Sequence, residues 1–312
     1  MIQISLFLFF IFGTAVGSFL NVIAYRSVHG DPKRPDLKKF PRSGLRSILF
    51  GSSVCPKCKH KLGPVDLIPI VSFLLLKGRC RYCHKKISPQ YPLVEVATGI
   101  LFAFTFFHWY YSISLINSIN SINSINFILL INLIYLLFIV STLVVLFITD
   151  FRDSLLPNSI VLPAIVVVAA YKLLQGISGS LGNIREYQGA ASSSLIFPHF
   201  PSYSLIFLDF LAAFLVASGF FAIVYLSRER ALGGGDIKFV FLISLAVGWP
   251  SLLVALWLAF LTGGAVAAML LLTRKKRFGQ TVPLGPFLAI GAIVALFWGQ
   301  QIIGWYLSVL GT

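Results

Sequence analysis

Two aspartates stand out in an otherwise apolar sequence because their positions suit acid–base chemistry. Asp150 follows a long apolar run, and Asp236 follows three glycines and opens another apolar run. The chain holds only 10 acidic residues, so each position is informative. Two carboxylates that share one proton can divide the work of hydrolysis, one as general base on a water and the other as proton donor to the scissile carbonyl. The pair therefore predicts a hydrolytic site, provided that the fold brings both side chains together.

Structural roles for the same two aspartates are the alternative. Asp150 can cap the link that follows it or pair with Arg152, and Asp236 can serve as the N-cap of its helix, where a carboxylate satisfies free N–H groups. The glycines before Asp236 remove side-chain bulk, which lets a substrate or another helix approach the backbone closely. The local sequence is compatible with both interpretations.

The chain contains four cysteines, and they form two C-x2-C pairs: Cys55 with Cys58, and Cys80 with Cys83. Each pair can turn two thiolates toward one point, and two such pairs make the tetrahedral shell that zinc favours. Because sulfur fills all four positions, none is open for water. We therefore expect a structural Zn²⁺ rather than a catalytic one. Disulfides are the alternative, and a reducing compartment disfavours them.

The composition determines which kind of fold must position these groups. Hydrophobic residues make up 57% of the chain and charged residues 11%, with a mean hydropathy of +0.89. Soluble proteins keep roughly a quarter of their residues charged. In lipid, backbone groups must be satisfied within helices or a closed barrel, and long uninterrupted apolar runs favour helices. The sequence predicts an all-α polytopic membrane protein.

About eight transmembrane helices are expected from a length of about 20 apolar residues per span. They cover approximately residues 3–25, 92–111, 127–149, 159–176, 205–226, 236–249, 251–272 and 284–309. The sixth is short and ends at a break over residues 248–250. A further apolar segment, residues 65–74, is too short to span and is expected at the membrane surface.

The net charge of +15 is concentrated beside these spans. Fifteen of the 25 lysines and arginines lie between Arg26 and Lys86. The positive-inside rule then places loop 26–91 in the cytoplasm and the amino end outside, with a retained first span. Clustering beside spans argues against nucleic acid as the partner and for the lipid bilayer.

Several short motifs occur in an order that resembles the type IV prepilin peptidase family over nearly the whole chain. Besides the paired cysteines and the two aspartates, they are Gly17-Ser18-Phe19-Leu20-Asn21, Tyr91-Pro92-Leu93-Val94-Glu95, Leu156-Pro157-Asn158, the GxGD motif Gly233-Gly234-Gly235-Asp236, and Pro283-Leu284-Gly285-Pro286-Phe287. Arg152 is a departure, since relatives often carry an acidic residue there.

The resemblance implies a bacterial cytoplasmic (inner) membrane enzyme with its active site and zinc loop on the cytoplasmic side. It would cleave the leader of type IV prepilins or pseudopilins of a type IV pilus or type II secretion system, with Asp150 and Asp236 as catalytic residues. It would also N-methylate the new amino terminus from S-adenosylmethionine. Glu95, beside the loop, is the one candidate for binding that methyl donor.

The resemblance also implies three parts: a first transmembrane helix (1–25), a cytoplasmic zinc-binding loop domain associated with methyl transfer (26–91), and a transmembrane GxGD-type aspartyl protease domain (92–312). Two hypotheses about function from other classes remain: a membrane transporter with a zinc loop, and a non-enzymatic scaffold for pilus or secretion assembly. The transporter hypothesis explains the spans and the edge carboxylates but not the order of the motifs. The sequence carries no signal for oligomeric state.

Overall fold

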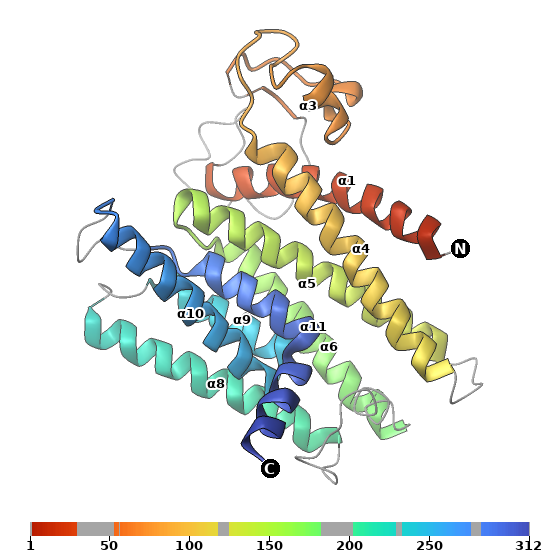
Figure 1. Ribbon diagram of the computed structural model, residues 1–312, viewed down its shortest axis with the longest axis vertical. Coiled ribbons are helices and arrows are strands. Elements are labelled where there is room, and N and C mark those ends of the chain that lie inside the picture. The colour runs from red at the N-terminus through yellow and green to blue at the C-terminus, as the bar shows by residue number, and fades with distance from the viewer. Residues whose placement is uncertain are drawn as a thin grey trace. The chain divides into compact units, whose positions relative to one another are not determined.

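The computed structural model of the protein is mostly helical in the part that it describes, which is residues 2–29, 53–55, 57–117, 125–181, 202–228, 233–275 and 282–311. Seven helices there are long and apolar enough to cross a bilayer. They are α1 (Ile2–His29), α4 (Gln90–Asn117), α5 (Ile125–Asp153), α6 (Asn158–Leu181), α8 (Ser202–Ser227), α10 (Ser251–Leu272) and α11 (Gly285–Leu310), all visible in Figure 1.

An eighth helix corresponds to the short sixth span of the prediction. This helix, α9 (Gly234–Val247), has 14 residues, a length of about 21 Å at 1.5 Å per residue. The hydrocarbon core of a bilayer is about 30 Å thick. Counting α9, the prediction of about eight membrane helices agrees with the structure, although α9 alone is too short to cross.

Several helices run further than their apolar cores. The first was expected to end near residue 25 and continues to His29, and α5 was expected to end at 149 and continues to Asp153. The hydropathy criterion stops at the first polar residues, whereas the backbone stays helical until something breaks it. After α5 that break is Ser154, whose φ is 50°. Asp150 therefore lies in the last turn of a helix rather than in a link.

Contacts divide the chain into two compact units, residues 1–149 and 150–312. In the first unit, α1 packs closely against α4 because glycines remove side chains from the contact. A Cβ atom added to Gly17 would lie 2.9 Å from the Cα of Glu95, and one added to Gly13 would lie 2.7 Å from the Cβ of Phe102. Small residues at such contacts are typical of membrane helices.

Between α1 and α4 the described loop carries the short helices η2 (Pro64–Leu67) and α3 (Val71–Leu75). They form from the apolar segment that we expect at the membrane surface. Leu74 and Leu75 of α3 are 68% and 76% exposed, which is compatible with that expectation. The N–H of Ile70, just before α3, donates to Glu95 Oε2 of α4 at 2.8 Å, so this segment is tied to the start of a membrane helix.

In the second unit, α9 is the central element and contacts α6, α8, α10 and α11. Phe239, Val240 and Ile243 of α9 are fully buried. In Figure 1 this short helix lies among its longer neighbours. Because α9 begins at the glycine-rich motif, its burial fixes the position of Asp236 in its first turn.

Candidate active site and metal centre

Asp150 is held by the first residue of a helix distant in the sequence. Its side chain lies in the last turn of α5, and the residue is only 5% exposed. The N–H of Gly285 donates to Asp150 Oδ2 at 2.8 Å. Gly285 begins α11, and the first N–H groups of a helix lack partners within it and favour negative charge. The α11 terminus therefore orients and stabilises an ionised Asp150.

The approach of Gly285 to Asp150 requires a residue without a side chain. A Cβ atom added to Gly285 would lie 2.5 Å from Asp150 Oδ2 and 2.8 Å from its Cγ. Sequence reasoning did not assign this glycine to the site. The motif Pro283-Leu284-Gly285-Pro286-Phe287 contains it, but the resemblance gave this motif no role in the site.

Asp236 occupies the third position of α9, and Gly233 is the N-cap. Asp236 Oδ2 accepts the N–H of Gly233 at 3.1 Å. The structural role considered from sequence is thus present, although Asp236 caps the helix from inside and is not itself the N-cap. This capping bond fixes the rotamer of a half-buried carboxylate at the end of a rigid helix.

The two aspartates belong to one cluster of helix ends within the second unit. The carboxyl group of Asp236 lies close enough to that of Asp150 for the charge of one to act on the other. The link after Asp150 also meets the start of α9, because a Cβ atom on Gly235 would lie 3.2 Å from the Cβ of Leu156. Lys238 Nζ donates to Asn158 Oδ1 at 3.0 Å across the same junction. The arrangement brings two carboxylates within range of each other's charge, as acid–base hydrolysis needs.

The neighbours of Asp150 have other partners. Arg152 Nε lies 3.9 Å from Asp153 Oδ1, and both residues are more exposed than Asp150. This contact is too long for a strong ion pair at the protein surface. It leaves Asp150, rather than Asp153, as the carboxylate held by α11.

The four cysteines lie together in the first unit. One sulfur from each of Cys55, Cys58, Cys80 and Cys83 lies within 4.8 Å of all the others. The Sγ atoms of Cys55 and Cys83 are 4.0 Å apart. A tetrahedral zinc with Zn–S bonds of about 2.3 Å needs sulfurs about 3.8 Å apart. The cluster can hold a metal ion of this kind with sub-ångström adjustment.

Both cysteine pairs are built by the same local hydrogen bonds. The N–H of Cys55 donates to His60 O at 3.0 Å, and the N–H of Lys59 donates to Cys55 O at 2.8 Å. Cys80 repeats the pattern with the O of Lys85 and the N–H of His84, at 3.0 Å each. Lys59 and His84 also share a positive φ, of 59° and 55°. Two equivalent turns thus present their sulfurs to one point.

The peptide N–H groups of the first turn affect the pKa of its two thiols, Cys55 and Cys58. Burial works to raise the pKa of Cys55, but hydrogen bonds from the backbone of Cys58 and Lys57 outweigh it and lower the pKa to about 7. The His60 backbone works to lower the pKa of Cys58, but desolvation and the neighbouring sulfurs together outweigh it and raise the pKa to about 11. We take Cys55 as the first thiolate, since backbone N–H donors stabilise its charge directly.

Glu95, the candidate for binding a methyl donor, is buried in α4 and 7% exposed. Its carboxylate accepts hydrogen bonds from the N–H of Ile70 and from the Ser18 side chain of α1. These contacts join three segments of the first unit. They give Glu95 a positioning role for the loop.

Two sequence profiles match this chain in succession. The profile of the bacterial peptidase A24 N-terminal domain matches residues 11–109, which include all four cysteines and Glu95. The profile of the type IV leader peptidase family matches residues 137–268, which include Asp150 and Asp236. The chain belongs to the type IV leader peptidase family. The resemblance inferred from the order of the motifs is thereby confirmed.

Relatives of this leader peptidase family member align with nearly its whole length. A prepilin leader peptidase/N-methyltransferase from Aeromonas salmonicida is 28% identical over 322 residues, covering 97% of this chain and 94% of the relative. Proteins of the same name from Pseudomonas aeruginosa and Bacillus subtilis are 27% and 28% identical, covering 96% and 84% of this chain and 92% and 88% of themselves. No solved structure matches the chain.

Proposed function

We propose that this protein cleaves the leader peptide of type IV prepilins or pseudopilins with Asp150 and Asp236, and then N-methylates the new amino terminus. Membership of the leader peptidase family and the names of its relatives support both activities. The observation that carries the catalytic assignment is the cluster of helix ends. There Gly285 holds Asp150, and Asp236 lies within electrostatic range.

Peptide hydrolysis at this pair follows from one shared proton. The ionised carboxylate takes a proton from a water molecule, and the oxygen of that water attacks the scissile carbonyl carbon. The protonated carboxyl group donates to the carbonyl oxygen, which carries the developing negative charge. Collapse of the tetrahedral intermediate breaks the C–N bond, and the leaving amine takes the proton that the first carboxylate removed from water. The other carboxylate regains its proton from the intermediate's hydroxyl group. The N–H of Gly285 keeps Asp150 in place throughout.

The metal and methyl-transfer assignments belong to the first unit. We propose that the four-cysteine cluster holds Zn²⁺ and that S-adenosylmethionine is the methyl donor. Bound zinc would crosslink the two turns, with Cys55, Cys58, Cys80 and Cys83 as its ligands. The division into a first helix (1–25), a zinc-binding loop (26–91) and a protease domain (92–312) is part of the same proposal.

We also propose that the catalytic aspartates and the zinc loop face the cytoplasm. The clustering of basic residues between Arg26 and Lys86 supports this orientation. A prepilin is itself anchored by an apolar helix. A cleavage site at the headgroup boundary would then meet Asp150 and Asp236 at the ends of α5 and α9.

The test is mass spectrometry of a prepilin co-expressed with the wild-type protein, Asp150→Asn or Asp236→Asn, and with Asp153→Asn as the matched control. We expect wild type and Asp153→Asn to remove the leader and add one methyl group. Each of the other two variants should leave the prepilin uncut while the enzyme stays in the membrane with its metal bound. Normal processing by Asp150→Asn or Asp236→Asn would refute the catalytic assignment.

A further inference from the structure

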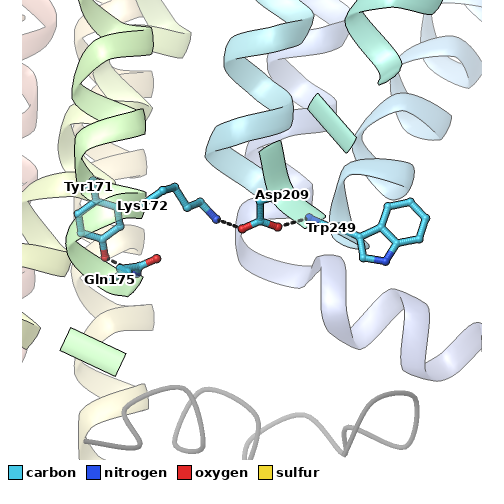
Figure 2. A network of polar contacts seen from close by, with 5 residues as sticks. All are labelled: Tyr171, Lys172, Gln175, Asp209 and Trp249. Carbon is cyan, nitrogen blue, oxygen red and sulfur yellow. Dashed lines mark hydrogen bonds and ion pairs between the residues drawn. The ribbon is translucent and has the colours of Figure 1, made fainter. Parts of the chain in front are cut away.

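A buried ion pair lies away from the proposed active site. Lys172 Nζ of α6 lies 2.9 Å from Asp209 Oδ2 of α8, and the two residues are 7% and 4% exposed. Asp209 Oδ1 accepts the N–H of Trp249 at 2.8 Å (Figure 2). Charged side chains inside membrane-spanning helices are costly, so a role is expected for them. The proposed chemistry uses neither residue.

The depth of this network follows from helix lengths. Trp249 lies just past the end of α9, whose 14 residues extend about 21 Å from Gly234. Lys172 lies 14 residues beyond Asn158, where α6 begins, which is also about 21 Å along the helix at 1.5 Å per residue. Both values are less than the roughly 30 Å of a hydrocarbon core. With the starts of α6 and α9 at the edge of the hydrocarbon core, as proposed above for Asp236, the turn between α9 and α10 lies within the bilayer, where unpaired N–H groups are unfavourable.

The geometry of this turn depends on both charged groups. Gly248 has a φ of 76°, and a Cβ atom there would lie 2.9 Å from Asp209 Oδ1 and 3.0 Å from Lys172 Nζ. The carboxylate satisfies the N–H of Trp249. The ammonium group balances the carboxylate and lies near the negative end of the α9 dipole. The pair thus holds the carboxyl end of α9 at one depth.

We propose that Lys172 and Asp209 are positioning residues that set the depth of α9 and, through it, the place of Asp236. Between Asp236 and Val247 the helix has no glycine or proline, so a shift at one end moves the other. Asp236 lies in the first turn, and the capping bond from Gly233 ties its carboxylate to the start of the helix. The effect on cleavage rests on the proposed function, whereas the effect on the turn does not.

Removing one charge of the Lys172–Asp209 pair should destabilise the turn more than removing both. A buried charge that loses its partner is strongly unfavourable, whereas a neutral pair of similar shape is often tolerated. Lys172→Met removes the ammonium group that lies 2.9 Å from Asp209 Oδ2 and leaves the negative charge of Asp209 in place. The double variant Lys172→Met/Asp209→Asn removes both charges and keeps an oxygen that accepts from Trp249. Asp209→Leu removes the acceptor itself. Tyr171→Phe, one residue earlier in α6, is the matched control.

The first measurement is hydrogen exchange of the full chain in nanodiscs, read at the Trp249 amide and along α9. We expect Asp209→Leu and Lys172→Met to raise exchange at Trp249 at least about tenfold, and the double variant and Tyr171→Phe to stay near wild type. Unchanged exchange in Asp209→Leu would overturn the inference, whether or not the protein cleaves prepilin.

The second measurement is prepilin cleavage per folded enzyme. Because a displacement of about 1 Å can cost about 100-fold, we expect Asp209→Leu to lower kcat by about 10- to 100-fold with KM changed less than about twofold. The double variant should have a kcat close to that of the wild type, well above the kcat of Lys172→Met. A wild-type kcat in Asp209→Leu, or a double variant as impaired as Lys172→Met, would show that the pair does not position Asp236.

Discussion

At the scale of single residues, the proposed catalytic site depends on a glycine as much as on its carboxylates. Gly285→Ala should lower prepilin cleavage by about 100-fold, because the added Cβ would lie 2.5 Å from Asp150 Oδ2 and must displace the carboxylate or α11. Cleavage per folded enzyme measures the effect. Gly304→Ala is the matched control, since it lies in the same helix and nothing surrounds its Cβ position within 4 Å. Equal cleavage by both variants would contradict the assignment of Gly285.

Glu95 offers a test of positioning against cofactor binding. Its carboxylate accepts a hydrogen bond from the Ile70 N–H. Glu95→Ala would leave this partly buried N–H without its acceptor, at a cost of up to about 1–3 kcal/mol, whereas Glu95→Gln keeps an accepting oxygen. We expect Glu95→Gln to retain methylation and Glu95→Ala to lose part of it together with bound metal. Prepilin methylation and metal content are measured in parallel. Loss of methylation in Glu95→Gln with full metal content would instead indicate that the charge binds the methyl donor.

The residue types of both sites were recognisable in the sequence, but their partners were not. Asp150, Asp236 and the cysteines stand out because acidic residues and thiols are rare in this chain. The bond from Gly285 to Asp150 joins residues 135 positions apart, and no local pattern encodes it. The sequence allowed Asp236 a capping role, because helix starts have a local signature. It did not identify Gly233 as the N-cap, because the exact cap position has no such signature.

At the scale of elements, the loop between α1 and α4 has only short helices and two isolated bridges in its described residues, so side-chain contacts such as the Arg81–Asp66 ion pair and the cysteine cluster must hold it together. Removing the metal should therefore unfold this loop and leave the membrane helices intact, because structural zinc contributes about 10–16 kcal/mol to folding. Hydrogen exchange with and without a chelator tests this expectation. Exchange should rise over residues 57–89 and stay unchanged over α9.

Removing the metal also separates the two proposed activities when prepilin processing is measured. If the loop serves methylation alone, the chelated enzyme should still cut the prepilin at Asp150 and Asp236, which lie in the second unit. The product would then lack its methyl group in the mass spectrum. A loop that stays protected without metal would refute a structural role for zinc.

Element boundaries were predicted less well than element types. Hydropathy located every membrane helix, but it ended α5 at the last apolar residue, whereas the backbone continues to Asp153. It also could not say whether α9 crosses a membrane. A 14-residue helix is stable here because its neighbours bury it on several sides, which depends on packing rather than on its own sequence.

At the scale of the whole molecule, composition alone predicted the architecture. A chain with 57% hydrophobic residues and few charges has no soluble alternative of this size, and its uninterrupted apolar runs exclude a barrel. The division of the chain into units at Asp150 was not predictable, because it reflects which helices touch. The predicted division at residues 25 and 91 follows motif order instead and remains a proposal.

The orientation of the molecule gives the last prediction. From the charge pattern we expect the loop between α1 and α4, the α5–α6 link, the α8–α9 link and the α10–α11 link to face the cytoplasm. A fluorescent protein fused after Arg228 or Lys275 should therefore be bright, and alkaline phosphatase fused there should be inactive. Fusions within residues 118–124 or 182–201 should show the opposite pattern. A reversed result would place Asp150 and Asp236 outside and exclude cleavage of a leader on the cytoplasmic side, whereas the expected result puts both aspartates and the basic loop on one face.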